Sequence, residues 1–444
     1  MAIMSAQQQV RPSIAARLPF FFGWVIIAVA FVTMALSVSA RTAFSLMFPP
    51  IVDEFGWERG LAAGAFSFGF LVSAGVSPLL GRLIDRRGPR FVIEIGVLVT
   101  AAGLMGATLI TAPWHLYATL GLLVGIGANC MSYSVHSQFL PNWFVRHRGL
   151  AIGIAFSGVG AGAILILPWL QALILHDGWR SACWKLGVIT LVVLVPINLL
   201  VAKHPEDLGL LPDGERQTPG AAKKRPSNIV DAAWAATEWT VPRAIRTGRF
   251  WWLAVSYFAG GWIWYAVQVH QTKYLVEIGF EPMLAAWSLG VVGMAGIPGQ
   301  IVLGALSDRF GRELMWSMAC LGFAISYGAL LLLAAIHQDG APSQPLLWLM
   351  VLSQGLLGYA IATIMGPIVA EIFEGKRFGS IFSLLMVALI GGGAAGPFFT
   401  GLLHDWTGTY TIAFALGIFF SVVCAVGVWI AAPRKVRVVA GSLR

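Results

Sequence analysis

Long apolar stretches dominate this chain and leave it few possible folds. Runs of twenty or more mostly hydrophobic residues recur along its length, and a helix of about twenty residues crosses roughly 30 Å of hydrocarbon. Only helices or closed barrels satisfy every backbone hydrogen bond in lipid, and runs of this length without strict alternation exclude a barrel. The predicted fold is therefore an all-α membrane protein. The expected spans are residues 20–49, 58–81, 90–111, 114–142, 149–175, 181–202, 250–274, 283–306, 314–336, 346–372, 379–403 and 410–432.

The composition also favours a lipid environment. Of the 444 residues, 58% are hydrophobic and only 11% are charged, which is too few charges to cover a soluble protein of this size. The four cysteines stand singly inside apolar runs, without the spacing of a metal site or a disulfide framework. We therefore expect no metal and no cofactor, and we expect the cysteines to be small core residues. They are Cys130, Cys183, Cys320 and Cys424.

The basic residues indicate how the chain is oriented. All but five of the 29 lysines and arginines fall at the chain ends or in alternate loops, which predicts that both termini are cytoplasmic. The excess of positive charge therefore reports the topology of an inner-membrane protein and not a nucleic-acid partner. The five exceptions are Arg41, Arg59, Arg180, Lys185 and Lys273.

Three local patterns occur twice at nearly the same offset, as expected of a duplicated unit. The offsets are 223, 230 and 228 residues. The sequence therefore predicts two halves of six helices each, residues 1–202 and 250–444, joined by a polar cytoplasmic linker over 203–249. The end of the linker, residues 241–249, is expected to form a short amphipathic helix on the membrane surface. The repeated patterns are GRLIDRRGPR from Gly81 and GALSDRFGRE from Gly304, the glycine-rich stretches around Gly149 and Gly379, and the pairs His176-Asp177 and His404-Asp405.

The first repeated pattern resembles the signature of the major facilitator superfamily between its second and third helices. That signature has a glycine, an aspartate four residues later and basic residues around a further glycine. The resemblance implies the superfamily's fold, with twelve transmembrane helices as two six-helix halves. The matching residues are Gly81, Asp85, Arg86, Gly88 and Arg90, and in the second copy Gly304, Asp308, Arg309, Gly311 and Arg312.

Other stretches resemble the monocarboxylate and oxalate:formate antiporter branch of that superfamily. This resemblance covers nearly the whole chain and implies transport of a small organic anion. The matching stretches are Gly23-Trp24, FPPIVDEFGW at 48–57, WFVRHRGLAIGI at 143–154, HPEDLGLLPDG at 204–214 and WTVPRAIRTGRFWWL at 239–253.

The resemblance also implies a gate at the cytoplasmic face. In the superfamily the aspartate of the first signature loop interacts with the other half near the start of helix 11, where free amides and the helix dipole favour an anion. Asp85 and Asp308 are therefore expected to act in gating, with Arg86 and Arg90 completing a charge cluster. A purely topogenic role for the arginines is the alternative. The candidate gating residues are Gly81, Asp85, Arg86, Arg90, Asp308, Arg309 and Arg312.

Arg41 is the leading candidate for binding an anionic substrate. The branch commonly places an arginine in helix 8, and its oxalate exchanger has a lysine in helix 11, but residues 283–304 and 379–403 contain neither. A charge deep in the first helix is costly unless it faces a wet cavity or a partner, and a planar guanidinium suits a carboxylate. The alternative is an arginine that extends to the outer interface or pairs with Asp53 or Glu54.

Further candidates are polar side chains on three predicted helices. His270 is expected to bind substrate or carry a proton near neutral pH, unless it is simply an interfacial residue. Tyr133 and Asn129 lie one turn apart and are expected to share a helix face. The resemblance implies a substrate role for Tyr133, and a packed aromatic is the alternative. The other candidates are Tyr265, Gln268 and Tyr359.

The chain has no motif of an enzyme. GxSxG, P-loop and HExxH patterns are absent, and the lack of an ATP-binding motif implies secondary transport. The sequence therefore predicts a monomeric carrier of a small organic anion, a mono- or dicarboxylate, working by alternating access. The resemblance adds proton coupling or anion exchange. The alternatives are an exporter of drug-like or uncharged solutes, favoured by the missing cations in helices 8 and 11, and a sensor with a transporter fold.

Overall fold

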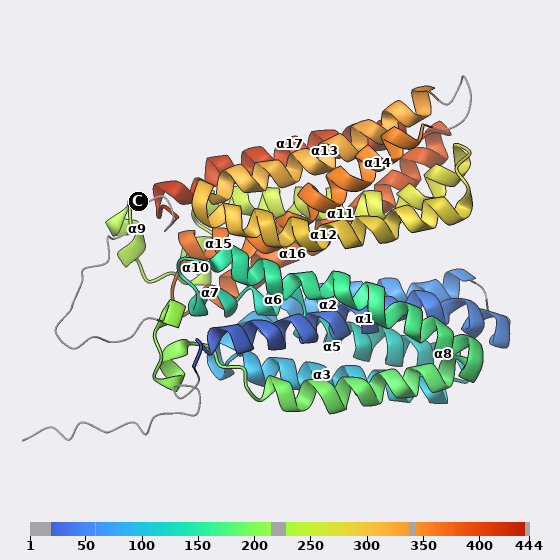
Figure 1. The fold of residues 1–444 in the computed structure, drawn as a ribbon, viewed down its shortest axis with the longest axis horizontal. Helices are drawn as coiled ribbons and strands as arrows, with labels where there is room; N and C mark the ends of the chain where they lie inside the picture. Colours follow the sequence, from blue (N-terminus) through green and yellow to red (C-terminus); the bar gives the residue numbers. More distant parts are fainter. Residues whose placement is uncertain (1–18, 58, 215–227, 337–342, 440–444) are drawn as a thin grey trace, which may run out of the picture.

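The computed structural model describes residues 19–57, 59–214, 228–336 and 343–439, and two bundles of helices fill most of it. Figure 1 shows one bundle in blue and green, from α1 to α8, lying below a second in yellow to red, from α11 to α17. We call them the N-half and the C-half. This arrangement agrees with the duplication predicted from the sequence.

The helices have the following bounds. The N-half contains α1 (Gly23–Phe55), α2 (Arg59–Arg87), α3 (Pro89–Gly106), α4 (Pro113–Leu116), α5 (Val124–Cys130), α6 (Tyr133–His136), α7 (Leu140–Trp143) and α8 (Arg148–Asn198). Two short helices, α9 (Ala232–Ala236) and α10 (Val241–Ala244), belong to the linker. The C-half contains α11 (Gly248–Glu277), α12 (Pro282–Phe310), α13 (Arg312–Ile336), α14 (Gln344–Leu352), α15 (Ile361–Ile372), α16 (Phe378–Thr407) and α17 (Thr411–Ala431).

The lengths of these elements are consistent with twelve membrane crossings. Among the described residues, ten helical runs are long and apolar enough to span a bilayer. One of them, α8, has 51 residues and leaves the helical conformation at Gly178 (φ 80°, ψ 161°), so it is long enough for two crossings. The 30 residues of α11 are long enough for a further crossing.

The two signature segments are mostly helical, although the sequence predicted loops there. The helix α2 continues through Arg87 and α12 through Phe310. The chain turns at Gly88 (φ 84°) and Gly311 (φ 104°), positive values that glycine adopts without steric cost. One glycine is enough to reverse each chain, so the charged residues before it stay in the last helical turn, where cations complement the helix dipole.

The end of the linker forms a shorter helix than predicted. Only Val241–Ala244 is helical there, and the chain then turns before α11 begins at Gly248. The hydroxyl of Thr247 accepts a hydrogen bond from the backbone N–H of Phe250 (3.3 Å) and so caps α11. The linker therefore ends at Thr247, two residues before residue 249, where the predicted surface helix was expected to end.

Two of the spans are interrupted, and they are related by the internal repeat. The run 113–143 contains a π-helical stretch, Tyr117–Leu123, and a break at Ser132, whose backbone is extended (φ −78°, ψ 175°). The run 344–372 contains a π-helical stretch, Ser353–Leu357, followed by a 3₁₀ turn. The prediction that Asn129 and Tyr133 share one helix face is therefore wrong, because the helix is broken between them.

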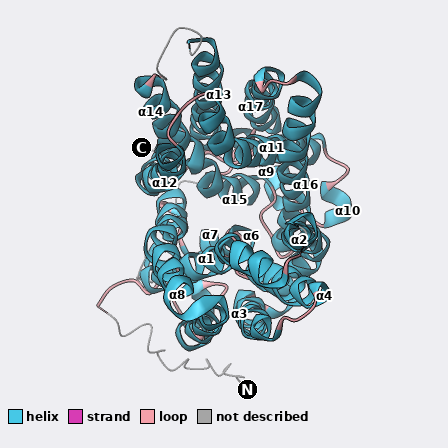
Figure 2. Ribbon diagram, turned by 90° about the vertical axis from the view of Figure 1, so that its right-hand side faces the viewer, coloured by secondary structure: helices cyan, strands magenta, loops and turns pink. Residues whose placement is uncertain are grey.

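The described chain begins and ends at one end of the bundle, together with α9 and α10 (Figure 1). We call this the linker end and the opposite end the far end. Near the linker end the two halves approach closely at glycines. A Cβ atom on Gly81 would overlap the carbonyl oxygen of Gly379, and one on Gly149 would overlap that of Gly304. Seen from the far end, α6, α7 and α15 are visible between the halves (Figure 2).

Candidate functional site

Arg41 lies in the middle of α1, where that helix faces the other half. Its guanidinium carbon is 3.7 Å from the centre of the Phe70 ring on α2. Phe70 in turn makes an edge-to-face contact with Tyr265 of α11, with 6.0 Å between ring centres. One guanidinium nitrogen, Nη2, is buried and has no hydrogen-bond partner among the described residues. Arg41 therefore presents an unsatisfied donor near the interface between the halves.

The other basic residues outside the predicted cytoplasmic loops have acidic partners where the structure describes their side chains. Glu54, which the sequence offered as a partner for Arg41, instead accepts from Arg180 and from the indole of Trp179 (2.8 Å). Arg180, Lys185 and Lys273 each pair with a carboxylate, whereas Arg41 has no carboxylate partner among the described residues. The three ion pairs are Arg180 with Glu54 (2.6 Å), Lys185 with Asp177, and Lys273 with Glu277 (3.6 Å).

Four of the other candidate residues gather around the same interface. The amide of Gln268 donates to the hydroxyl of Tyr359 (2.6 Å). The phenols of Tyr133, Tyr265 and Tyr359 lie near one another, and the Phe70 ring links Arg41 to Tyr265. The structure thus brings together residues from both halves. We call Arg41, Tyr133, Tyr265, Gln268 and Tyr359 the arginine–tyrosine group.

The repeat relates two members of this group. Tyr133 and Tyr359 are 226 residues apart, within the range of the offsets that reveal the duplication. Tyr133 directly follows the break at Ser132, and Tyr359 lies in the 3₁₀ turn that follows the π-helical stretch Ser353–Leu357. Tyr359 also stacks on Trp264, with 4.4 Å between ring centres. Trp264 and Phe70 are neighbours of the group that sequence reasoning missed, because an apolar ring gives no sign of which face it occupies.

Asn129 and His270 make their hydrogen bonds elsewhere. The amide of Asn129 donates to the Ser73 carbonyl (3.0 Å) and the Ser77 hydroxyl (3.2 Å), and so joins α5 to α2 inside the N-half. His270 Nε2 lies 2.9 Å from the Pro397 carbonyl oxygen, and its Nδ1 lies 3.4 Å from the hydroxyl of Tyr410. These bonds hold α11 to α16 and to the start of α17. We therefore leave both residues out of the arginine–tyrosine group.

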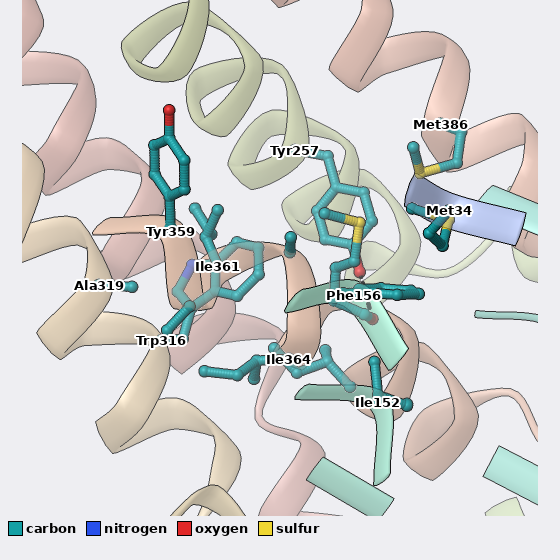
Figure 3. Packing of buried hydrophobic residues seen from close by; sticks show 14 of the residues in the cluster. Met34, Ile152, Phe156, Tyr257, Trp316, Ala319, Tyr359, Ile361, Ile364 and Met386 are labelled. Atoms are coloured by element: carbon teal, nitrogen blue, oxygen red, sulfur yellow. Dashed lines mark hydrogen bonds between the residues drawn. The ribbon is translucent and has the colours of Figure 1, made fainter. Parts of the chain in front are cut away.

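An apolar layer lies on the linker side of the group. It includes Met34 of α1, Phe156 of α8 and Met386 of α16, which are at most 5% exposed and belong to one cluster (Figure 3). The Tyr133 ring meets that of Phe156 edge to face at 4.7 Å. Side chains from both halves therefore exclude water between the arginine–tyrosine group and the linker end.

Beyond this layer, Asp85 of α2 caps a helix of the opposite half. Its carboxylate accepts hydrogen bonds from the backbone N–H groups of Gly379 (3.2 Å) and Ser380 (2.9 Å) and from the Ser380 hydroxyl (2.7 Å). These groups form the start of α16, where free amides and the helix dipole stabilise an anion. The Asp85 side chain is only 4% exposed, and Lys203 approaches it to 3.9 Å.

Asp308 of α12 does the same for α8. It accepts hydrogen bonds from the N–H groups of Gly149 (2.9 Å) and Leu150 (3.1 Å) and pairs with Arg312 at 2.7 Å. Arg312 also reaches the carboxylate of Glu371 at 2.9 Å. Each half therefore inserts one carboxylate into a helix start of the other. We call these two contacts the Asp85 lock and the Asp308 lock.

The remaining predicted gating residues have different surroundings. Arg86 and Arg90 are exposed and do not contact Asp85 in the part of the chain that the structure describes, so the predicted charge cluster is wrong in its members. Lys203 takes their place because the linker returns past the end of α2. Arg309 is exposed next to Phe310, with 5.7 Å between its guanidinium carbon and the ring centre.

A second set of charges, missed in the sequence, surrounds the Asp308 lock. Glu374 lies 3.8 Å from Arg148 of the N-half and 2.9 Å from Arg437 of the C-terminal tail. Arg437 also donates to the backbone carbonyl of Glu371 (2.7 Å). The sequence signal was two acidic residues, Glu371 and Glu374, at the end of an apolar run. Arg437, in the basic C-terminal tail, was interpreted only as one of the positive charges that set the topology.

Two helical halves with reciprocal locks at one end define a polytopic membrane transporter. The sequence profile of the Major Facilitator Superfamily matches residues 29–364, well over half of the chain. The chain belongs to this superfamily, whose members are transporters and not enzymes.

Known relatives and solved structures agree with this assignment. The chain is 27% identical over 401 residues to monocarboxylate transporter 13 of Bos taurus, covering 89% of this chain and 86% of that protein. Human monocarboxylate transporter 11 is 28% identical, with 89% and 80% covered. The fold resembles the proton:xylose symporter XylE (TM-score 0.69, 14% identity, 92% and 95% covered) and FucP (TM-score 0.63, 17% identity, 92% and 99% covered).

Asp85→Asn should slow transport far more than it weakens substrate binding. The asparagine keeps the shape but removes the charge that two helix amides stabilise, and the site lies beyond the apolar layer. We expect at least a tenfold loss of transport rate in proteoliposomes and less than a threefold change in Kd by calorimetry. Asp177→Asn, which removes an exposed carboxylate at the far end, is the control and should leave both unchanged. Weaker binding with an unchanged rate would contradict the gating role.

Proposed function

We propose that this chain is a secondary transporter of a small organic anion, a mono- or dicarboxylate. The observation that carries the proposal is the unpartnered guanidinium of Arg41 near the interface between the halves. A charge in the membrane interior is costly and marks a functional site by default. Its aromatic neighbours attract the cation but cannot neutralise it. A carboxylate would supply the missing charge and accept two parallel hydrogen bonds from the planar guanidinium.

Two further features support an organic acid as substrate. The phenols of Tyr133, Tyr265 and Tyr359 surround the same interface and are donors that can orient a carboxylate. The names of the bovine and human relatives also specify monocarboxylate transport. We extend that substrate class to this chain on the strength of Arg41. The branch carries cations in its eighth and eleventh membrane helices, and the corresponding residues here, 283–304 and 379–403, contain none. Arg41 of α1 replaces them.

We also propose an orientation and a conformational state. The linker end carries exposed arginines, among them Arg82, Arg86, Arg87 and Arg90, which the positive-inside rule assigns to the cytoplasm. Both termini would then be cytoplasmic in the inner membrane. The Asp85 and Asp308 locks and the apolar layer would close the cytoplasmic side of a monomer. Transport follows when the halves, residues 1–202 and 250–444, rock about the arginine–tyrosine group.

The charge of Arg41 also favours one coupling mode, exchange of one anion for another. No acidic side chain pairs with Arg41 among the described residues, so an empty carrier would reorient with a bare positive charge in the membrane interior. Binding an anion removes that charge and lowers the cost of reorientation. A proton-coupled carrier would instead need an acidic group to release its proton beside Arg41. We therefore propose that exchange is faster than net transport.

Arg41→Ala and Arg41→Lys should both lose anion binding. A point charge on a flexible stem does not reproduce two parallel hydrogen bonds, so lysine is a poor substitute. We expect Kd for the cognate acid, found by a thermal-shift screen of organic acids, to rise at least tenfold, or about 1.4 kcal/mol. Lys273→Ala, which removes a cation paired with Glu277, is the control. Variants that stay folded and bind within threefold of the parent would favour an exporter of uncharged solutes.

Proteoliposomes loaded with unlabelled acid should take up the labelled acid at least ten times faster than empty ones. The loaded carrier returns with its charge neutralised, whereas the empty carrier does not. An inward pH gradient should not restore the rate in empty vesicles. If it does, the carrier is a proton symporter, and the exchange proposal fails while Arg41 keeps its binding role.

A further inference from the structure

We propose that Gln271 and Gln354 form a second polar subsite, which binds a neutral hydrogen-bonding group of the transported acid. The inference rests on the proposed function and narrows it to a substrate class. The solute would be a monocarboxylate that carries a hydroxyl, keto or amide group apart from its carboxylate. Arg41 would hold the carboxylate, and the two amides would hold the neutral group.

Both glutamines are fully buried without partners. Each is 0% exposed, and neither the nitrogen nor the oxygen of either amide has a hydrogen bond among the described residues. Most buried polar groups in proteins are paired, so an amide with both atoms unsatisfied calls for an explanation. Two nearby buried hydroxyls do find partners, one on α11 and one on α13. Tyr257 donates to the Met365 carbonyl (2.6 Å), and Tyr327 donates to that of Ile263 (2.8 Å).

The hydrogen bond from Gln268 to Tyr359 places the two amides at a similar depth. Gln271 is three residues beyond Gln268 on α11, which runs from the linker end to the far end. Gln354 is five residues before Tyr359 in the run 344–372, which runs in the opposite direction. Both glutamines therefore lie on the far side of this bond, within about one or two helical turns of the arginine–tyrosine group. They extend its polar character within the C-half toward the far end.

The backbone at Gln354 is also unusual. Gln354 lies in the π-helical stretch Ser353–Leu357, and such stretches occur frequently at functional sites. A Cβ atom on its neighbour Gly355 would come within 2.6 Å of both the Val292 carbonyl oxygen and the Ala295 side chain. The stretch is thus held tightly against α12. This contact holds the π-helical stretch around Gln354 in place.

The chemistry of the two amides selects the ligand group. An amide both donates and accepts hydrogen bonds but carries no charge, so it suits a hydroxyl, a carbonyl or another amide. A second carboxylate would need a cation to offset its loss of water. Residues 283–304 and 379–403, which flank this part of the C-half, contain no lysine or arginine. The subsite therefore favours a neutral group and excludes the dicarboxylate option of the proposed function.

The test compares matched acids on matched variants. The probes are butyrate, 4-hydroxybutyrate and succinate, together with hexanoate, 6-hydroxyhexanoate and adipate, measured by calorimetry. The parent should bind at least one hydroxy acid tenfold more tightly than its unsubstituted acid or diacid. Gln271→Leu and Gln354→Leu should reduce this preference to below threefold and change the affinity for the unsubstituted acid by less than threefold. Both variants should melt at or above the temperature of the parent, because each removes an unsatisfied buried amide.

The outcomes separate this inference from the proposed function. If alkanoates bind and depend on Arg41 but the parent prefers no hydroxy acid, the subsite fails and the proposed function stands. If the preference survives in both leucine variants, or if both melt well below the parent, the amides are structural and the inference is overturned. If no acid binds the parent, both proposals fail. Asn198→Leu controls for the loss of a buried amide within the N-half, where Thr33 pairs with Asn198 at 3.2 Å.

Discussion

The contacts on which the rest of this structure depends are two carboxylates that cross between the halves. Asp85 and Asp308 each accept two backbone N–H groups at the start of a helix in the opposite half. Those N–H groups have no partner within their own helix, and the helix dipole favours an anion there. Separating the halves would leave both carboxylates and four amides to find water. The locks therefore stabilise contact at the linker end.

The short side chain of aspartate explains the glycines around the locks. A carboxylate one bond from Cβ reaches a backbone amide of another helix only if the two helices nearly touch. Gly81 lies against Gly379, and Gly149 lies against Gly304, so that no side chain separates the backbones. The close approach also brings the apolar layer of Met34, Phe156 and Met386 together. The arginine–tyrosine group consequently lies on the far side of a sealed end.

Much of this arrangement was predictable from the sequence, since long apolar runs, charge asymmetry and the duplicated signature fix the spans and the two halves. The contact between Asp85 and the start of α16, the eleventh predicted span, also followed from the resemblance. The partner of Glu54 did not follow from the sequence. Glu54 pairs with Arg180, which is 126 residues away in the chain, and this leaves Arg41 unpaired. The helix breaks around Ser132 and Gln354 were also missed, because π-helical and extended residues have no clear signal in an apolar run. The placement of Asn129 and of Gln354 depended on those breaks.

The distance between the halves at the linker end tests the account most directly. All four native cysteines are buried, so spin labels can be attached at Arg82→Cys and Lys376→Cys, which are exposed positions in opposite halves. Pulsed electron paramagnetic resonance should give a single short distance for this pair in the carrier without substrate. Replacing both Asp85 and Asp308 by asparagine should add a second, longer distance, because the locks no longer hold the linker end closed. An unchanged distribution in the double variant would show that other contacts close this end, and would contradict the account.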